Sequence, residues 1–399
     1  MGRRDVRDPE PRRAGRRGAP AAERVRHGPL ARRGPGTARR RARRLADPRR
    51  RAHRDEERRL SRAREGRPRI VVLDGYTLNP GDNPWTELGA LGEIEVFDRS
   101  SPGEVVSRAS GAEIVVTNKA VLTAEAIAEL PHLRFVAVTA TGYDVVDGKA
   151  ARARGIPVSN VPEYGTDSVA QHTIALLLEL TNAVGEHDRA VHEGEWARSP
   201  DFCLWHRSPL ELTGLAFGVV GFGTIGRRVG RLASALGMRV IATGRPGGSA
   251  SSTVSRSEPD FAPPAWRSLD ELFAEADVVS LHCPLTAENE RFVDAARLAR
   301  MKPTALFLNT ARGGLVDEAA LAEALRRGVI AGAAVDVVSR EPIDPGNPLS
   351  TAPRCLVTPH LAWASLAARR RLMATTVENV RAFLEGSPIH VVNPGSGVD

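Results

Sequence analysis

A glycine-rich loop constrains the fold of this chain more than any other feature. The apolar residues 215–220 predict a buried strand, and the motif Gly221-Phe-Gly-Thr-Ile-Gly226 follows them directly. A helix is then expected through Leu236, closed by Gly237, and residues 239–243 predict a second strand. A strand, a tight glycine turn, a helix and a strand at this spacing are typical of a βαβ unit that binds a dinucleotide.

Each glycine of the motif has its own expected role. Gly221 permits the turn, Gly223 lets the backbone approach a pyrophosphate, and Gly226 lets helix and strand pack closely. The backbone amides of Thr224 and Ile225 would then point at the phosphates from the helix N-terminus. The alternative is a plain tight turn in which glycine only relieves a steric clash. The second strand at the expected distance favours the dinucleotide site.

Apolar runs and helix-like segments alternate along most of the chain. This alternation predicts the α/β class, with two Rossmann-like, doubly wound domains built on parallel sheets. The runs before the glycine motif are 69–74, 114–117, 135–139 and 156–159, and those after it are 278–282, 304–309, 330–335 and 355–358.

The same alternation gives the expected domain boundaries. We expect a flavodoxin-like substrate domain split between residues 68–165 and 366–395, and an NAD(P)-binding Rossmann domain at residues 166–365. Residues 167–184 are apolar nearly all round, which predicts a helix buried between the two domains. A last helix is expected at residues 365–385, where it would fold back on the first domain.

The charge of the chain divides sharply near residue 67. Residues 1–67 hold 25 Arg and 9 acidic side chains, a net charge of +16, whereas the rest of the chain carries 31 basic and 39 acidic side chains. The leader has few apolar residues, so we expect a disordered extension. Contact with nucleic acid is the less favoured alternative, and the nine acids also argue against a targeting peptide.

Cysteine usage and hydropathy bound the setting of the protein. The three cysteines are far apart and odd in number, which suits a reducing cytoplasm better than a disulfide framework. No apolar run reaches the roughly 18 residues needed to span a bilayer, so we expect no membrane segment. We also expect no metal site. The three cysteines are Cys203, Cys283 and Cys355.

Three side chains that follow predicted strands form a set suited to reducing a 2-keto acid. Arg312 can bind the substrate carboxylate with two parallel hydrogen bonds and polarise the carbonyl group. His360 can pass a proton to the carbonyl oxygen, and Glu341 can orient the ring and raise its pKa. Each has a simpler alternative: a surface ion pair for the Arg, a turn for Glu341-Pro342, and a packed core ring for the His.

The motifs of the chain, taken in order, resemble those of the D-isomer-specific 2-hydroxyacid dehydrogenase family, in particular its members similar to glycerate dehydrogenase and hydroxypyruvate reductase. The resemblance covers residues 69–393. Beside the glycine loop, it rests on Val72-Leu-Asp-Gly-Tyr76, Thr117-Asn-Lys119, Ala140-Thr-Gly-Tyr143, Ser168-Val-Ala-Gln171, His282-Cys-Pro284, Asn309-Thr-Ala-Arg-Gly-Gly-Leu-Val-Asp-Glu318, Ala334-Val-Asp336, Glu341-Pro342 and Pro359-His-Leu-Ala-Trp363.

The resemblance implies a homodimer of two-domain subunits, an active site in the interdomain cleft, and a role for each matching residue. Arg312, Glu341 and His360 would be the catalytic residues, with the Arg and the His also facing the cofactor. The nicotinamide would lie against Thr310, Ala311 and Asp336, and the adenosine side against Cys283 and Pro284. The loop of Ala140, Thr141, Gly142 and Tyr143 would hold the substrate carboxylate. Trp363 would either pack in the core or form a wall of the substrate pocket.

One departure from the family pattern bears on the cofactor. NAD-dependent members carry an acidic residue at the end of the second strand, but this chain has no Asp or Glu between residues 227 and 257. The strand ends in Thr243, Gly244 and Arg245, and an Arg there suits a 2′-phosphate. We therefore expect NADP(H), with NAD(H) as the alternative.

The expected reaction is reduction of a small 2-keto acid, such as hydroxypyruvate or glyoxylate, to the D-2-hydroxy acid. Phosphoglycerate, formate and phosphite dehydrogenases of the same fold are alternatives. The chain stops 39 residues after His360, which leaves no room for the regulatory domain that phosphoglycerate dehydrogenases usually carry. An NAD(P)-sensing corepressor is the alternative from another class. The intact Arg, Glu and His argue against it.

Overall fold

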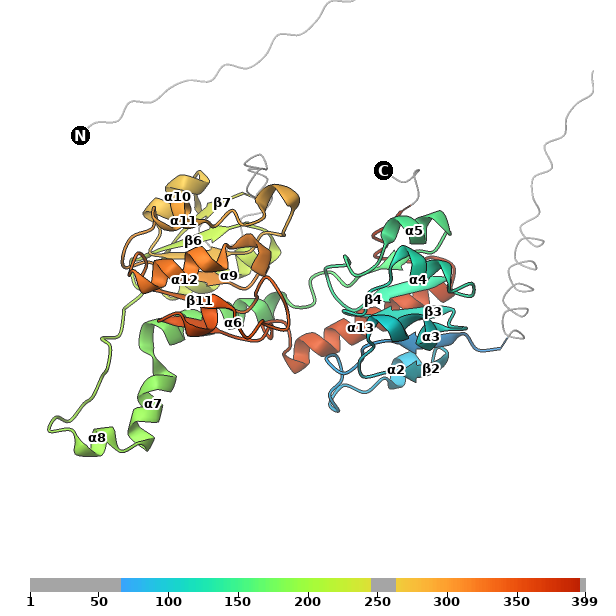
Figure 1. Ribbon diagram of the computed structural model, residues 1–399, viewed down its shortest axis with the longest axis horizontal. Helices are drawn as coiled ribbons and strands as arrows, with labels where there is room; N and C mark the ends of the chain where they lie inside the picture. The colour runs from blue at the N-terminus through green and yellow to red at the C-terminus, as the bar shows by residue number, and fades with distance from the viewer. Residues whose placement is uncertain (1–65, 245–262, 395–399) are drawn as a thin grey trace, which may run out of the picture. The chain divides into compact units, whose positions relative to one another are not determined.

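The computed structural model describes residues 66–244 and 263–394 (Figure 1). These residues form two parallel β-sheets with helices packed against them, so the predicted α/β class with two doubly wound sheets is confirmed. Most of the predicted extension at residues 1–67 lies outside the described residues, and so does Arg245. The exact domain boundaries stay a prediction.

The first sheet has five parallel strands in the order β2-β1-β3-β4-β5. This is the flavodoxin-like order, in which the chain reverses direction across the sheet between β1 and β3. The strands are β1 (Arg69–Val72), β2 (Glu93–Val96), β3 (Ile114–Thr117), β4 (Phe135–Val138) and β5 (Val158–Ser159).

Alternate side chains of these strands build two separate cores, one on each face of the sheet. Val71, Val115 and Val136 pack into one apolar cluster, and Ile70 and Phe135 pack into another. Because both faces are covered, β3 and β4 are buried at every residue, as parallel strands usually are. The short helices beside this sheet are α2 (Thr86–Gly89), η1 (Pro102–Glu104), α3 (Val105–Ala109), α4 (Ala124–Ala128) and α5 (Gly148–Ala153).

The C-terminal helix α13 (Leu366–Leu384) belongs to the first sheet, although it is last in the sequence. It packs against β4, and its Phe383 ring stacks on Phe135 with the ring centroids 4.5 Å apart. The segment after it forms a bridge between Val391 and Ser159 of β5. The chain therefore returns to its first sheet after it has completed the second.

The second sheet has seven parallel strands in the order β12-β11-β10-β9-β6-β7-β8. The chain starts at β6, moves outward through β7 and β8, then returns to β9 and moves outward in the other direction. Such a reversal beside the first strand is where doubly wound sheets bind ligands, at the carboxyl ends of the strands. The strands are β6 (Ala216–Val220), β7 (Arg239–Thr243), β8 (Ala265–Trp266), β9 (Val278–Leu281), β10 (Leu306–Asn309), β11 (Gly332–Val335) and β12 (Cys355–Val357).

Long and short helices cover this sheet. The apolar helix predicted at residues 167–184 is α6 (Thr166–Asn182), which packs on α9, β10 and β11 while Asp167 and Gln171 stay exposed. The other helices are α9 (Thr224–Ala235), α10 (Leu269–Glu275), η2 (Ala287–Asn289), α11 (Ala295–Leu298), η3 (Gly313–Leu315), α12 (Glu318–Arg326) and η4 (Pro348–Thr351).

A segment that we call the arm, residues 183–211, leaves the second sheet after α6. It contains α7 (Val184–His192) and α8 (Glu195–Arg198), which Figure 1 shows apart from the strands. Ion pairs and hydrogen bonds within the arm hold its shape. Arg207 pairs with Glu186 at 2.7 Å, and the Trp196 indole N–H donates to the carbonyl of Phe202 at 3.0 Å.

Candidate active site

Glu341 and His360 form a direct pair at the carboxyl side of the second sheet. Nδ1 of His360 lies 2.6 Å from Oε2 of Glu341, and the two side chains are 29% and 33% exposed. A contact this short is typical of a charge-assisted hydrogen bond. Since Glu341 occupies Nδ1, Nε2 is the ring atom left to exchange a proton with a substrate.

The surroundings of Glu341 keep its carboxyl group ionised. Burial by itself would raise the pKa of Glu341, but the hydrogen bond and charge of His360 lower it below its ordinary value. The Val338 amide, which donates to Oε1 at 3.3 Å, and the charge of Lys119 lower it further. An ionised carboxylate at this distance can accept a hydrogen bond from Nδ1 of His360 and orient the ring.

Arg312 follows β10 and caps the short helix η3. Its backbone is fixed by Asn309, whose side-chain amide donates to the Arg312 carbonyl at 2.9 Å. The guanidinium group is exposed and lies near the loop predicted to hold the substrate carboxylate. A β-carbon added at Gly142 would lie 3.1 Å from Nη2 of Arg312. The structure therefore brings these two predicted substrate contacts together.

The loop from Ala140 to Tyr143 leaves the carboxyl end of β4 and is tied to the segment that follows β5. The Thr141 hydroxyl donates to the Val161 carbonyl at 3.0 Å, and the Ala140 carbonyl accepts from the Val161 amide at 3.0 Å. Tyr143 is 45% exposed. These bonds fix the base of the loop, whose backbone amides are predicted to bind the substrate carboxylate.

Packing requires a glycine at two positions of the motif, Gly221 and Gly226, but not at Gly223. Gly221 has φ +92°, and a β-carbon there would lie 2.8 Å from the Cys283 amide nitrogen. A β-carbon at Gly226 would lie 2.2 Å from the Gly221 carbonyl oxygen. At Gly223 a β-carbon would meet nothing within 4 Å. The open side of the loop is thus at Gly223, as expected where a pyrophosphate approaches.

The first turn of α9 supplies the amide groups that a pyrophosphate would need. Thr224 is the first residue of this helix, and Ile225 packs against the apolar cluster beneath it. The Thr224 hydroxyl donates to Oε1 of Glu163 at 2.9 Å. Amides at a helix N-terminus favour anions, so this turn fits the phosphates of a dinucleotide.

The remaining predicted cofactor contacts lie at the carboxyl ends of neighbouring strands. Cys283 and Pro284 follow β9, with the thiol buried and the proline exposed. Thr310 and Ala311 follow β10, and the Thr310 hydroxyl lies 2.9 Å from that of Thr173 on α6. Asp336 follows β11 and is 1% exposed. The topology therefore aligns these residues along one edge of the sheet.

Trp363 contacts the apolar core as well as an aromatic neighbour. Its ring meets that of Tyr164 edge-on, with the centroids 6.2 Å apart, and it packs on a cluster that includes Leu78 and Met373. Burial raises the pKa of Tyr164 to about 12, although the charge of Arg312 opposes this, so its hydroxyl stays protonated. Packing accounts for Trp363, and its contact with substrate stays a prediction.

Three contacts in the site were not predicted from the sequence. His172 on α6 lies 3.1 Å from the Thr358 hydroxyl, Ser168 donates to the Ala362 carbonyl at 2.6 Å, and Glu163 accepts from Thr224. The motif at residues 168–171 was recognised without a role for its members. Nothing in the spacing of these residues indicates that a helix near residue 170 meets a turn near residue 360.

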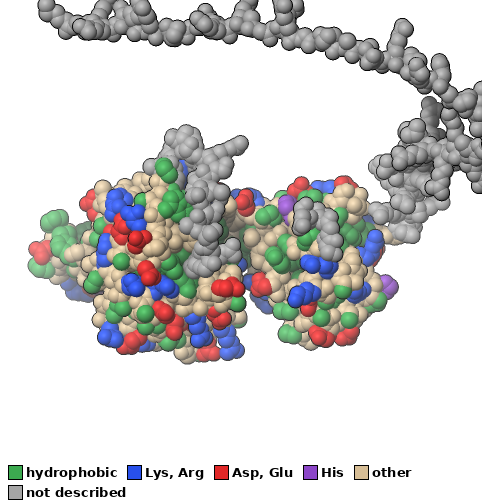
Figure 2. Space-filling model, turned by 90° about the horizontal axis from the view of Figure 1, so that it is seen from above, with side chains coloured by type: hydrophobic (Ala, Val, Ile, Leu, Met, Phe, Trp, Pro, Cys, Tyr) green, Lys and Arg blue, Asp and Glu red, His purple; other side chains and the backbone are tan. Residues whose placement is uncertain are grey.

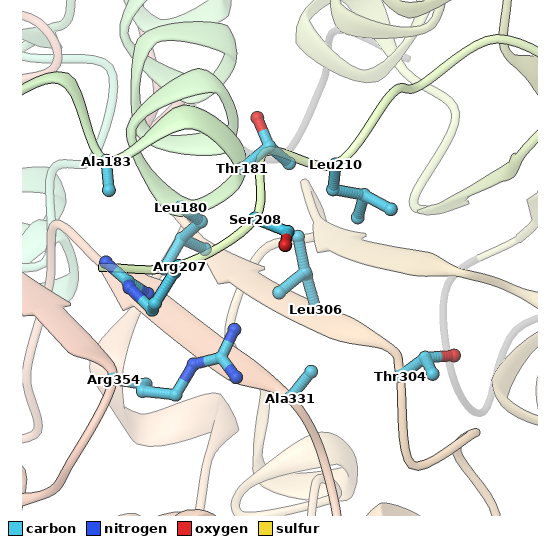
Figure 3. Close-up of a pocket in the computed structure, with 10 residues that line it drawn as sticks. All are labelled: Leu180, Thr181, Ala183, Arg207, Ser208, Leu210, Thr304, Leu306, Ala331 and Arg354. Atoms are coloured by element: carbon cyan, nitrogen blue, oxygen red, sulfur yellow. The ribbon is translucent and has the colours of Figure 1, made fainter. Parts of the chain in front are cut away.

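A small cavity of about 50 Å³ lies at the root of the arm, and none of its lining residues was predicted to belong to the site. Figure 3 shows Arg207 and Arg354, from two different segments, among the residues that line it. Within residues 66–244 and 263–394 no group of three His, Cys, Asp or Glu side chains is placed to bind a metal. In the same ranges no helix combines the length and apolar character needed to cross a membrane.

Comparison with known proteins identifies the family. The model of the D-isomer specific 2-hydroxyacid dehydrogenase NAD-binding domain matches residues 174–362. A hydroxypyruvate reductase from Blautia hydrogenotrophica is 47% identical over 330 residues, which are 82% of this chain and 99% of that protein. The chain belongs to the D-isomer-specific 2-hydroxyacid dehydrogenase family. It is therefore an oxidoreductase that acts on CH–OH groups, and the alternative of an NAD(P)-sensing corepressor is not favoured.

Two further similarities bear on the chemistry of this enzyme. A glycerate dehydrogenase from Methylorubrum extorquens is 40% identical over 327 residues, which are 81% of this chain and 98% of that protein. The crystal structure of an NADPH-dependent glyoxylate/hydroxypyruvate reductase from Sinorhizobium meliloti, in complex with NADP and malonate, aligns with a TM-score of 0.68 at 29% identity. This alignment covers 82% of this chain and 97% of the Sinorhizobium meliloti chain. The enzyme uses a nicotinamide cofactor to reduce small 2-keto acids.

Proposed function

We propose that this enzyme reduces hydroxypyruvate or glyoxylate to the corresponding 2-hydroxy acid, with D configuration where the product is chiral. The observation that carries the proposal is the 2.6 Å pair of Glu341 and His360, at the same edge of the sheet as the exposed Arg312 that follows β10. The relatives named hydroxypyruvate reductase and glycerate dehydrogenase, each matched over nearly its whole length, support the choice of substrate.

In the proposed mechanism Arg312 binds the substrate carboxylate and polarises the carbonyl oxygen, while amides of the loop at residues 140–143 hold the other side of the carboxylate. His360 donates a proton from Nε2 to the oxygen as negative charge develops there. Glu341 keeps the ring protonated and aligned through Nδ1. The reduced nicotinamide, when bound, supplies the hydride.

The residues at the carboxyl edge of the second sheet fit such a cofactor. The open side of the glycine loop and the first turn of α9 suit its pyrophosphate, whereas Thr310, Ala311 and Asp336 lie where the nicotinamide would be held. Cys283 and Pro284 would line the adenosine side. These assignments are part of the proposal.

The first test measures NADPH and NADH oxidation with hydroxypyruvate, glyoxylate, pyruvate and bulkier 2-keto acids. We expect the two small substrates to give the highest kcat/KM. His360→Ala should lower kcat by roughly 10²–10⁴-fold, the usual contribution of a general acid, and leave NADPH binding intact. Near-parental turnover in this variant, or a preference for bulky substrates, would contradict the proposal.

The pH profile tests the role of Glu341. Its carboxylate stabilises the protonated ring of His360, and reduction requires that proton. Glu341→Gln removes the charge, so the ring should lose its proton at lower pH and the alkaline limb of kcat for reduction should move to lower pH. Glu323→Gln, at an exposed site on α12, is the matched control and should leave the limb in place. A limb that is the same in Glu341→Gln and in the parent would exclude the pairing.

We propose that NADP(H) is the preferred cofactor. Strand β7 ends at Thr243, which is 8% exposed, and no carboxylate lies between residues 227 and 257 to repel a 2′-phosphate. Arg245, the residue proposed to pair with that phosphate, lies outside the described residues. The Sinorhizobium meliloti enzyme, which is NADPH-dependent, supports the same choice.

The change of Gly244→Asp together with Arg245→Ala should move the preference towards NADH. It installs an acceptor for the ribose hydroxyls and removes the partner of the phosphate. A charge-assisted hydrogen bond contributes about 1.5–3 kcal/mol, which corresponds to roughly ten- to a hundredfold in kcat/KM. The measurement is kcat/KM for both cofactors on the parent and the variant. A parent that prefers NADH tenfold or more would refute the proposal.

We propose that the enzyme is a homodimer and that the arm forms the interface. Half of the twelve large hydrophobic side chains exposed in the described residues lie on the arm, which is a small part of the chain, and such a concentration marks a contact surface. Phe202 is 91% exposed and Trp205 58%. Figure 2 shows hydrophobic side chains gathered on its left side, where Figure 1 draws α7 and α8.

The root of the arm carries positive charge that a second copy can balance. Burial and the neighbouring Arg207 lower the pKa of Arg354, against the attraction of Glu186. We also propose that the enzyme is cytoplasmic, because none of its three cysteines, all within the described residues, forms a disulfide.

Phe202→Glu combined with Trp205→Glu should convert the dimer to a monomer, because charges would be buried in the interface. Light scattering coupled to size-exclusion chromatography measures the mass. Val121→Glu, at a hydrophobic residue that is 48% exposed elsewhere, is the matched control and should remain dimeric. A monomeric parent, or a double variant that keeps the mass of a dimer, would exclude this interface.

A further inference from the structure

One edge of helix α6 contacts the two loops that carry Arg312 and His360. Ser168 donates to the carbonyl of Ala362, just beyond His360, at 2.6 Å. Thr173 meets the hydroxyl of Thr310, two residues before Arg312, at 2.9 Å. His172 lies between these contacts and is 82% buried, with a side-chain exposure of 18%. The mechanism above gives it no role.

His172 reaches the buried carboxylate of Asp336 through the hydroxyl of Thr358. That hydroxyl donates to Oδ1 of Asp336 at 2.6 Å, and Nε2 of His172 lies 3.1 Å from the hydroxyl oxygen and 3.5 Å from Oδ1. The hydroxyl of Thr358 has a single proton, and it donates that proton in the hydrogen bond to Asp336. Nε2 of His172 must therefore donate to Thr358, which fixes the proton on that ring atom.

The carboxylate of Asp336 in turn holds the turn on which His360 lies. Oδ1 accepts from the Leu361 amide at 3.0 Å and Oδ2 from the Ala362 amide at 2.9 Å. Burial alone would raise the pKa of Asp336, but the hydrogen bonds from His172, Thr358 and the two amides lower it below its ordinary value. The group is therefore an anion held by hydrogen bonds from the Thr358 hydroxyl and two backbone amides.

His360 needs this support because its backbone is strained. Its φ is +50°, in the left-handed region that residues other than glycine rarely adopt. Its amide donates to the carbonyls of Asp336 at 2.7 Å and Thr358 at 3.0 Å. Such a conformation persists only where the surroundings determine it from several sides.

We propose that His172 is a positioning residue for the reaction, which acts through Thr358 and Asp336 to aim His360 at Glu341 and at the substrate. The inference rests on the proposed function, since it takes His360 as the proton donor. His172 touches none of the reacting groups, and its contribution is to fix the turn at residues 358–362 in the one conformation that pairs Nδ1 with Glu341.

The test compares His172→Leu, which removes the donor, with His172→Gln, whose amide keeps one at the same reach. His172→Leu should lower kcat by about ten- to a hundredfold, the scale expected for a displaced catalytic group. The KM for NADPH should change less than about threefold. The alkaline limb of reduction should move to lower pH, because the ring moves away from Glu341. His172→Gln should recover kcat to within about threefold of the parent.

Two further variants separate positioning from a general loss of structure. Gln171→Leu, at the exposed neighbour on the same helix, should behave as the parent. Thr358→Val removes the hydroxyl that links His172 to Asp336, so it should lower kcat and move the alkaline limb as His172→Leu does. The double variant should lose no more kcat than either single variant. Thr358→Val also keeps the proposal testable if His172→Leu fails to fold. Parental kcat and pH limb in Thr358→Val, or additive losses in the double variant, would overturn it.

A readout without substrate distinguishes this proposal from the proposed function. The ¹⁵N shifts of the His360 ring report its tautomer and its pairing with Glu341, and they should change in His172→Leu but not in His172→Gln. Shifts that match the parent in both variants would overturn the positioning role. A parent that turns over no 2-keto acid would refute the proposed function alone, since the shifts would still test the positioning.

Discussion

The buried carboxylate of Asp336 is the constraint on which the rest of the site depends. An anion that is 1% exposed is stable only where donors surround it, and here they come from Thr358 and two backbone amides. Those amides belong to the residues that follow His360. The requirement to satisfy one charge therefore fixes the backbone of the turn that carries His360 and holds that residue in its strained conformation.

The parallel topology of the second sheet explains why groups that are far apart in sequence lie along one edge of it. Each strand of the second sheet delivers a loop at the same edge, so the glycine motif after β6, Arg312 after β10 and Asp336 after β11 lie in one row. The strands position the loops at one edge of the sheet, and the side chains of the loops carry the functional groups. Helix α6 then ties the β10 loop to the turn after β12 through Thr173 and Ser168.

The sequence predicted those parts whose signal is local. Runs of apolar residues marked the central strands, but β2 (Glu93–Val96) alternates with charged residues and β8 (Ala265–Trp266) has only two residues, so neither was predicted. The arm helices were missed because they are short and largely polar. The pairing of Glu341 with His360 could be predicted from the chemistry of a carboxylate and an imidazole that each follow a predicted strand. The contact of His172 with Thr358 joins residues that are 186 positions apart, and no local pattern indicates it.

The glycine motif has a consequence for redesign of the enzyme. The carbonyl oxygen of Gly221 occupies the space that a side chain on Gly226 would need, and the backbone of His282 and Cys283 occupies the space that a side chain on Gly221 would need. Neither can accept a side chain unless the backbone of the loop moves. Gly223 faces open space, so an alanine there would leave the fold intact and intrude only on a bound ligand. Gly223→Ala therefore probes the proposed pyrophosphate contact without a change in the packing of the loop.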